Sequence, residues 1–267
     1  MINNLLVGFL TVLFVWLAPA GANAAGTVIW EDLGRHFGGY TGSFVLYDED
    51  RDQYIIYNEA QSEKRLSPCS SFKIYNSLIG LETGVLDQED VYTLEKWDGT
   101  KYSIPAWNQD QTLASATRDS VVWYFQKLAS RIGHDQMQDY LDRLDYGNRD
   151  ISGGQTTFWL RSSLKISAME QVEMLKLISS ENSPFSSGNL AIVKKNITVS
   201  DANGVRLMGK TGSGYENNKW VLGWFVGMVE RDGKRYYFAT NVENGPEAHG
   251  GKARQITTAL LKELGVL

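Results

Sequence analysis

Three short groups of residues in this chain have the types and spacing of a nucleophilic serine centre. Ser70 is followed three positions later by Lys73. Residues three apart on a helix share one face, so the lysine amine would lie within reach of the serine hydroxyl and supply the base that a serine nucleophile needs. At a helix N-terminus, exposed backbone N–H groups would also stabilise an oxyanion formed during acyl transfer. The second group is Ser120-Val121-Val122, and the third is Lys210-Thr211-Gly212.

A second set of residues repeats this pattern. Ser162 and Lys165 have the same spacing as Ser70 and Lys73. Ser187-Gly188-Asn189 resembles the Ser-x-Asn form of the second group. The segment from Ser162 to Lys165 precedes Ser167, which is predicted to cap the next helix, so we expect the segment not to be helical. Without a helix the spacing of three has no meaning, and we place the nucleophile at Ser70.

The groups are positioned by four predicted helices. Apolar residues recur at helical spacing after Ser70, and Gly84 suits a helix C-cap. Ser167 followed by Glu170 forms a capping box at the start of another helix. The predicted helices span residues 70–84, 120–132, 168–178 and 252–264.

Strands are predicted at both ends of the chain. The segments 41–47 and 53–57 read as a hairpin, and three further strands are predicted at 205–210, 220–230 and 235–242, with a tight turn at 231–234. Strands at both ends with helices between them predict an α+β fold: one antiparallel sheet, flanked by helices, with a helical lobe at about residues 65–185. No linker or repeat interrupts the pattern, so a single domain is expected over residues 25–267.

Composition excludes several classes of function. The chain has 267 residues, a formal net charge of −5 and three scattered histidines, whereas a nucleic-acid surface needs clustered Lys and Arg. Cys69 is the one cysteine, so no internal disulfide can form, and no group of residues has metal-ligand spacing. The sequence does not define an oligomeric state.

The first residues predict export. An apolar run from Leu5 to Leu17 is followed by Ala22-Asn23-Ala24, the small-residue pattern of a signal-peptide cleavage site, so residues 1–24 are predicted to be a signal peptide. The segment before the run has no Lys or Arg, which leaves an uncleaved membrane anchor as the alternative, although the run is short for a bilayer. After signal removal no membrane span is expected.

Together the motifs resemble those of the class D (oxacillinase-type) serine β-lactamases over nearly the whole mature length. The elements that carry the resemblance, in order, are Pro68-Cys69-Ser70-Ser71-Phe72-Lys73, Trp107, Ser120-Val121-Val122, Tyr146-Gly147-Asn148, Phe158-Trp159-Leu160 and Lys210-Thr211-Gly212. Val122 stands where related classes carry asparagine. The resemblance implies the fold of the penicillin-recognising serine transpeptidases, a β-lactam as substrate, and hydrolysis through a Ser70 acyl-enzyme.

The resemblance also implies roles for the residues around Ser70. Lys73 would react with carbon dioxide to form a carbamate (N6-carboxylysine), the general base, and Trp159 would donate a hydrogen bond to it. Burial would keep the lysine amine unprotonated, and Phe72, Val122 and Leu160 are the expected apolar walls. Ser120 would relay a proton to the lactam nitrogen, or else act only as a helix N-cap. No cofactor beyond carbon dioxide or bicarbonate is implied.

Substrate binding is assigned in the same way. Lys210, Thr211 and Gly212 would line the site, and the backbone N–H groups of Ser70 and Ser213 would form the oxyanion hole. Arg254, or alternatively Lys252, would bind the substrate carboxylate. Trp107 and Tyr146 are expected to shape the site.

Two functions share all of these motifs, and a third shares some of them. The first is hydrolysis of β-lactams, and the second is a receptor that is acylated but deacylates slowly. Trp159 and Val122 favour the hydrolase, because they would build the pocket for the carbamate. A peptidoglycan transpeptidase would carry asparagine in the middle motif and additional domains.

Overall fold

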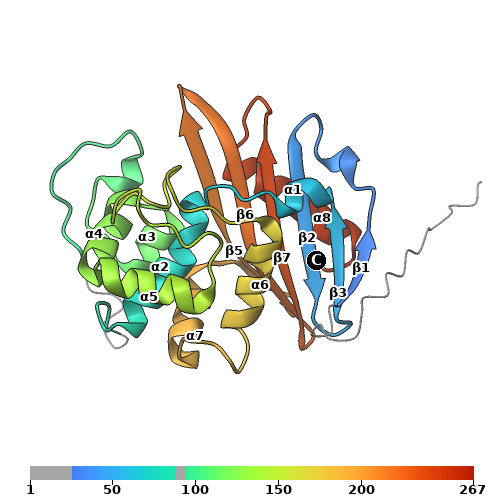
Figure 1. The fold of residues 1–267 in the computed structure, drawn as a ribbon, viewed down its shortest axis with the longest axis horizontal. Helices are drawn as coiled ribbons and strands as arrows, with labels where there is room; N and C mark the ends of the chain where they lie inside the picture. The colour runs from blue at the N-terminus through green and yellow to red at the C-terminus, as the bar shows by residue number, and fades with distance from the viewer. Residues whose placement is uncertain (1–25, 88–93) are drawn as a thin grey trace, which may run out of the picture.

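The computed structural model describes residues 26–87 and 94–267, so the predicted signal peptide lies outside the described residues. The centre of the fold is a seven-stranded sheet of order β1-β3-β2-β7-β6-β5-β4 (Figure 1). The strands are β1 (Thr27–Trp30), β2 (Thr41–Asp48), β3 (Gln53–Tyr57), β4 (Thr198–Ala202), β5 (Val205–Glu216), β6 (Lys219–Arg231) and β7 (Lys234–Glu243).

The two ends of the chain meet in this sheet, as predicted. β2 pairs antiparallel with β7 from Thr41 opposite Glu243 onward, which joins the N-terminal strands to the C-terminal ones. One pair differs from the prediction, because β1 runs parallel to β3. The chain reverses once between β1 and β2 and again between β2 and β3, so β1 and β3 run in the same direction and meet at the sheet edge. The predicted tight turn is confirmed, since Arg231 pairs with Lys234 around Asp232 and Gly233, both at positive φ.

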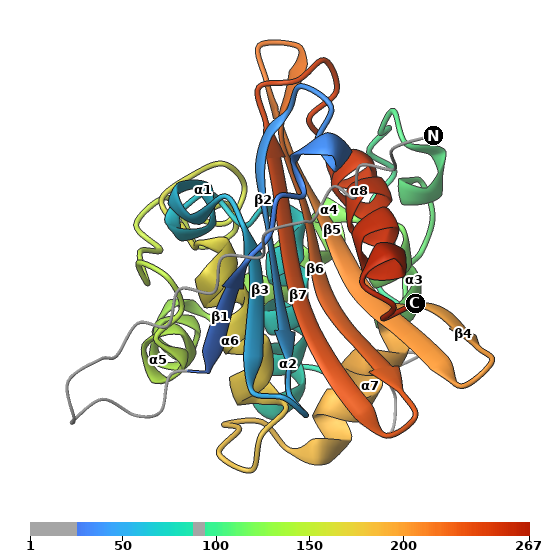
Figure 2. The same cartoon turned by 90° about the vertical axis from the view of Figure 1, so that its right-hand side faces the viewer.

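Helices cover the two faces of the sheet unequally, as Figures 1 and 2 show. A helical lobe lies against one face and α8 alone against the other. The helices are α1 (Glu59–Glu63), α2 (Lys73–Glu82), α3 (Leu113–Arg118), α4 (Val122–Ile132), α5 (His134–Leu144), α6 (Ala168–Ile178), α7 (Ser187–Asn196) and α8 (Gly250–Glu263), with short 3₁₀ turns at Gly34–His36, Cys69–Phe72 and Pro105–Trp107. The capping box of α6 is confirmed, with Ser167 and Glu170 bonded reciprocally.

Two helix beginnings differ from the prediction in an instructive way. Residues Cys69–Phe72 form a 3₁₀ turn, and the α-helix begins only at Lys73. The helix predicted from residue 120 begins at Val122, because Ser120 has a φ of 55°, in the left-handed region. Both changes occur at the predicted site, where the backbone departs from regular structure.

The sheet separates two apolar cores. β6 is buried on both faces: Trp224, Val226 and Met228 pack toward the helical lobe, whereas Phe225 and Val229 pack toward α8. Gly223 lets the beginning of α8 approach closely, since a Cβ there would lie 2.3 Å from the His249 carbonyl oxygen. Within residues 26–87 and 94–267, no helix has the length and apolarity needed to cross a membrane.

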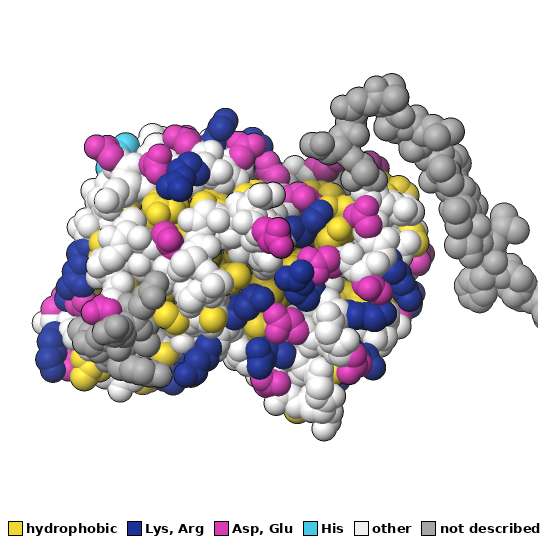
Figure 3. Space-filling view, turned by 90° about the horizontal axis from the view of Figure 1, so that it is seen from below, with side chains coloured by type: hydrophobic (Ala, Val, Ile, Leu, Met, Phe, Trp, Pro, Cys, Tyr) yellow, Lys and Arg dark blue, Asp and Glu magenta, His cyan; other side chains and the backbone are white. Residues whose placement is uncertain are grey.

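Charged side chains of both signs alternate over the face shown in Figure 3. Many charged residues of the protein form ion pairs, such as Lys194 with Glu230 at 2.9 Å and Lys234 with Asp50 at 3.0 Å. This face therefore presents a mixed rather than a uniformly basic surface.

Candidate active site

Ser70 and Lys73 lie one turn apart, where the 3₁₀ turn Cys69–Phe72 continues directly into α2. The Lys73 Nζ atom donates a hydrogen bond to the Ser70 Oγ atom over 2.6 Å. Lys73 is completely buried, whereas Ser70 is half-buried and reaches the surface of the site. The serine is therefore accessible to a ligand while its partner amine is held away from water.

Ser120 joins the two lysines of the site. Lys73 Nζ lies 3.1 Å from the Ser120 carbonyl oxygen and 3.2 Å from its Oγ atom, and Lys210 Nζ donates to the same Oγ over 3.0 Å. Its left-handed backbone directs both oxygens toward Lys73. Ser120 does not cap α4, whose N-cap is Val121 without a side-chain hydrogen bond.

The two lysines have lowered pKa values because both are buried. Burial, together with the nearby charge of Lys210, holds the pKa of Lys73 well below its ordinary value. Burial lowers the pKa of Lys210 to about 8. In the described part of the chain no carboxylate pairs with Lys73, so nothing compensates a buried charge there. The neutral amine is the form that this environment favours, and a neutral amine is a base.

β5 brings the third motif against the nucleophile. A Cβ on Gly212 would lie 2.7 Å from the Pro68 carbonyl oxygen and 3.2 Å from the Ser71 nitrogen, so only glycine allows this approach. On the other face of β5, the Ser213 Oγ atom accepts a hydrogen bond from the Gly250 nitrogen over 3.0 Å, which fixes the beginning of α8. β4 pairs only with Val205–Met208, so β5 from Lys210 onward has no strand neighbour on that side among the described residues.

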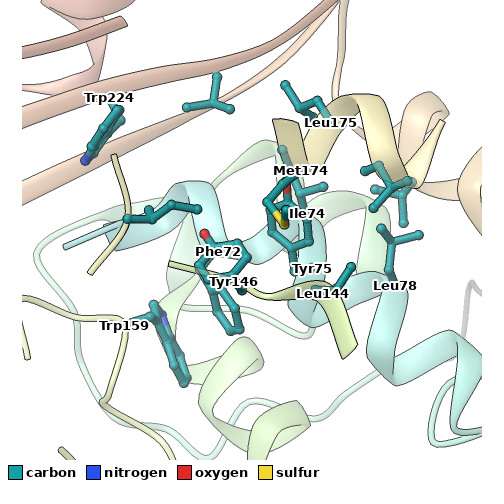
Figure 4. Packing of buried hydrophobic residues seen from close by; sticks show 14 of the residues in the cluster. Phe72, Ile74, Tyr75, Leu78, Leu144, Tyr146, Trp159, Met174, Leu175 and Trp224 are labelled. Atoms are coloured by element: carbon teal, nitrogen blue, oxygen red, sulfur yellow. The ribbon is translucent and has the colours of Figure 1, made fainter. Parts of the chain in front are cut away.

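An aromatic cluster packs around Phe72, two residues after Ser70 (Figure 4). The Phe72 ring lies 5.8 Å from that of Trp159 and 5.5 Å from that of Tyr146. Trp159 is fully buried, and its Nε1 atom has no hydrogen-bond partner in the described part of the chain; the Tyr75 hydroxyl of the same cluster lacks one as well. Buried donors without partners are costly, so an acceptor that entered this cluster would be stabilised by them.

Two of the three expected apolar walls around Lys73 are less buried than Phe125, which sequence analysis did not assign to the pocket. Val122 and Leu160 are half-buried. The Phe125 ring centre lies 5.4 Å from Lys73 Nζ, and Phe125 is fully buried. Its position three residues after Val122 on α4 is the signal that could have identified it.

Trp107 lies at the approach to Ser120. Its Nε1 atom donates to the Asp119 carbonyl oxygen over 3.0 Å, and Trp123 Nε1 donates to the Trp107 carbonyl oxygen over 2.9 Å. The half-buried Trp107 thus fixes the loop that carries Ser120, which is a shaping role.

The two candidate cations of α8 point in different directions. Arg254 is exposed and lines a surface groove with β4 and the beginning of β5. Lys252 lies over the Tyr40 ring, 5.6 Å from its centre, and bonds Gln255. Within the described residues neither cation contacts the group of Ser70, Lys73, Ser120 and Lys210.

The rival set of residues does not form a second centre. Residues Ser162 to Lys165 are not helical, as predicted, and the Ser162 and Ser163 hydroxyls donate to the Gly153 and Asp150 carbonyl oxygens. Ser187 begins α7, outside this segment. Cys69 beside the nucleophile is buried, which raises the pKa of its thiol to about 11 and keeps it protonated.

Sequence analysis also missed a cation at the other end of the site. The half-buried Arg161 pairs with Glu216 at the end of β5, with 2.9 Å from Nε to Oε1 and 2.7 Å from Nη2 to Oε2. The two residues are 55 positions apart in the sequence, so no local signal marks the pair.

Comparisons with known proteins agree with this geometry. Residues 42–262 match the model of the penicillin binding protein transpeptidase domain. The chain is 41% identical to the methicillin resistance MecR1 protein of Staphylococcus aureus, over 88% of the chain but 40% of that protein. It is also 41% identical to the probable β-lactamase YbxI of Bacillus subtilis, over 85% of the chain and 82% of that protein. The chain thus spans less than half of the length of MecR1.

Solved structures of the same fold include a β-lactamase and a receptor domain. The class D β-lactamase BAT-2 superimposes with a TM-score of 0.82 at 40% identity, covering 89% of this chain and 97% of that one. The C-terminal domain of the Bacillus licheniformis BlaR penicillin-receptor superimposes with a TM-score of 0.86 at 36% identity, covering 94% and 100%. The chain therefore belongs to the penicillin-interacting serine proteins with a penicillin-binding transpeptidase domain, in the group that contains the class D β-lactamases.

Proposed function

We propose that the protein hydrolyses β-lactams through a covalent intermediate on Ser70. The observation that carries this proposal is the fully buried Lys73 amine, 2.6 Å from the Ser70 hydroxyl oxygen and without a carboxylate partner in the described chain. Burial favours the neutral form of this amine, and the neutral form can accept the serine proton. Because residues 1–24 have the pattern of a secretory signal, we also propose that the protein acts outside the cytoplasm.

The residues present can carry each step of acyl transfer. Ser70 Oγ attacks the lactam carbonyl carbon while its proton passes to the base at Lys73, and the backbone N–H groups of Ser70 and Ser213 stabilise the oxyanion. When the carbon–nitrogen bond of the lactam breaks, Ser120 passes a proton to the departing nitrogen, since its hydroxyl contacts both Lys73 and Lys210. Attack of water on the ester then releases the opened product and restores the serine.

A carbamate on Lys73 is part of this proposal. The neutral amine would add to carbon dioxide with loss of one proton, and the carbamate oxygen would take the proton of Ser70 and later that of the attacking water. The unpartnered Trp159 N–H supports this assignment, because a carbamate oxygen would supply the acceptor that this buried donor lacks.

A receptor that is acylated but not hydrolysed is the second candidate. The similarity to the BlaR penicillin-receptor domain over its whole length favours it, as does the similarity to MecR1. Both candidates require Ser70 acylation and differ only in the fate of the ester.

The deciding experiment combines turnover with intact mass. The protein is mixed with a chromogenic β-lactam, absorbance is followed, and samples are quenched for mass spectrometry. Sustained turnover with little adduct supports the hydrolase, whereas one equivalent of persistent adduct supports the receptor. The absence of both contradicts the proposal.

A bicarbonate series tests the carbamate separately. Degassed protein at mildly acidic pH should lose hydrolysis, because acid protonates the amine and decomposes the carbamate, and bicarbonate at neutral pH should restore it. Trp159→Phe keeps an aromatic ring but removes the N–H donor, so it should need more bicarbonate and accumulate adduct. Hydrolysis independent of bicarbonate in both proteins, with no carbamate signal in carbon-13 NMR, would leave the neutral Lys73 amine as the base.

A further inference from the structure

Three residues on the face of β5 that points to the helical lobe show in which order the groups of the site lie along this strand. Lys210 reaches Ser120, a Cβ on Gly212 would contact the Pro68 carbonyl oxygen, and a Cβ on Gly214 would lie 2.6 Å from the Arg161 Cδ atom. Alternate residues of a strand are about 6.7 Å apart. Ser70, next to the Gly212 contact, therefore lies between Lys210 at one end and Arg161 at the other.

Arg161 is held in place through both its backbone and its side chain. Its backbone N–H donates to the Ser67 hydroxyl over 2.9 Å, its φ is 55°, and its side chain lies against Gly214. Its partner Glu216 lies on the last residue of β5, directly before two asparagines at positive φ. The Arg161 side chain is 27% exposed and the Glu216 side chain is 44% exposed. The cation is thus the fixed member of the pair, and the anion is the one that solvent and ligands reach more easily.

Such a pair is replaceable. An exposed ion pair adds little to stability, so a second carboxylate that presents the same two oxygens can take the position of Glu216 at small cost. Carboxylates are the natural partner of the planar guanidinium group, which binds both oxygens at once. Arg161 is therefore a preformed anion-binding group at the mouth of the site.

The shape of a β-lactam says which part of it would meet this group. The ring carboxylate and the acylamino side chain lie on opposite sides of the lactam carbonyl. With the carbonyl carbon at Ser70 and the ring carboxylate toward Lys210, the acylamino side chain extends along β5 toward Gly214 and Arg161. We propose that the Arg161–Glu216 pair selects β-lactams by the charge on the acylamino side chain: Arg161 binds an anionic side chain, which displaces Glu216.

This inference rests on the proposed function, but its test does not require hydrolysis. Benzylpenicillin, ampicillin and carbenicillin carry hydrogen, an ammonium group and a carboxylate at the same α carbon of the side chain. The second-order acylation rate of each is measured as kcat/KM if the protein turns the β-lactam over, and as the rate of adduct formation by intact mass spectrometry if it does not. The readout is the ratio of the carbenicillin rate to the benzylpenicillin rate, so a general loss of activity cancels.

The variants are Glu216→Gln, Arg161→Gln and the charge exchange Arg161→Glu with Glu216→Arg. Removing the competing carboxylate in Glu216→Gln should raise the ratio by roughly three- to fivefold, the size of an exposed ion pair, and Arg161→Gln should lower it by a similar factor. The charge exchange keeps an ion pair in place but should lower the ratio too, because a carboxylate at position 161 would repel carbenicillin. Arg206→Gln, which breaks the Arg206–Asp201 pair at the other end of β5, is the control and should leave the ratio unchanged.

A ratio of carbenicillin to benzylpenicillin rates that stays the same in all three variants would overturn the inference, even if every absolute rate falls. The Arg161–Glu216 pair would then only connect the helical lobe to the sheet. Turnover of a β-lactam, or formation of a covalent adduct, would in that case still support acylation. Failure of the unaltered protein to show either turnover or an adduct would contradict the proposed function itself.

Discussion

The two faces of the sheet differ in how completely their buried polar groups are satisfied. On the helical-lobe face, Lys73 and Lys210 are buried. In the described chain, every buried side-chain nitrogen or oxygen atom that lacks a hydrogen-bond partner belongs to residues 75–179. On the α8 face, the buried Thr257 and Thr240 hydroxyls bond each other over 2.6 Å. The chemistry therefore lies on the face with unsatisfied groups, and the other face supplies stability without such costs.

Backbone strain follows the same division once Asp and Asn, which tolerate the left-handed region, are set aside: the other described non-glycine residues at positive φ are Cys69, Ser120, Arg149 and Arg161. Cys69, Ser120 and Arg161 flank the site, and all three are non-glycine residues at positive φ, a conformation that costs about 1–3 kcal/mol each. Strain that persists next to a nucleophile indicates that the surrounding packing holds it in place. Changes on the lobe face should consequently affect chemistry more than folding, and changes on the α8 face should do the reverse.

The largest effect is expected from Ser70→Ala, which should abolish both hydrolysis of a β-lactam and covalent labelling by it. No other hydroxyl in the described chain combines a position at the start of a helix with a buried lysine 2.6 Å away. Ser162→Ala is the matched control and should label normally. A labelled Ser70→Ala protein would move the nucleophile elsewhere.

Lys73→Met should separate activity from stability. Acylation should fall by roughly a hundred- to ten-thousandfold with the loss of the base. Stability should rise by about 1–2 kcal/mol, because an apolar side chain replaces a buried amine. Urea unfolding of degassed protein, in which Lys73 is an amine rather than a carbamate, tests the stability, and acylation rates in bicarbonate buffer test the activity.

The sign of the pH dependence follows from the lowered pKa of Lys73. The unfolded chain binds a proton at Lys73 below about pH 10.5, whereas the folded chain binds it only at a much lower pH. Between these two pKa values the unfolded state holds the additional proton, so the wild-type protein loses stability as the pH falls from about 10.5 toward the folded-state pKa. The advantage of Lys73→Met should therefore grow from pH 10 toward pH 7. A constant difference would mean that the amine is protonated in the folded protein.

Arg254→Ala should give an intermediate effect. If Arg254 turns from its groove to meet the substrate carboxylate, its removal should slow acylation by about ten- to a hundredfold, the value of a charge-assisted hydrogen bond. Lys252→Ala should change the rate little, since Lys252 lies over Tyr40. A large loss with Lys252→Ala alone would transfer the role to Lys252, and no loss with either would leave the carboxylate to Lys210 and Thr211.

The smallest effect on chemistry is expected on the α8 face. Leu260 is fully buried between α8 and the sheet, so Leu260→Ala should lower the free energy of unfolding by about 2–5 kcal/mol. Acylation rates at a temperature where the variant stays folded should equal those of the wild type. A slowed acylation would show that α8 packing reaches the site through Gly250 and Ser213.

The sequence by itself determined the features that depend on neighbours in the chain. The spacing of Ser70 and Lys73, the capping box of α6 and the turn between β6 and β7 all involve residues a few positions apart, and periodicity and turn chemistry describe such contacts well. The placing of the N-terminal strands beside the C-terminal ones was also predicted, because strands at both ends leave few other arrangements.

Only the tertiary structure decided how distant segments meet. Lys73 and Ser120 are 47 residues apart, Ser120 and Lys210 are 90 apart, and the left-handed backbone of Ser120 has no signature in its sequence. The pairing of Arg161 with Glu216, the direction of Arg254 and the lack of a partner for Trp159 likewise depend on packing between elements. Local propensities fix which segments are helix or strand, whereas the burial that lowers the pKa of Lys73 exists only after those segments have excluded water together.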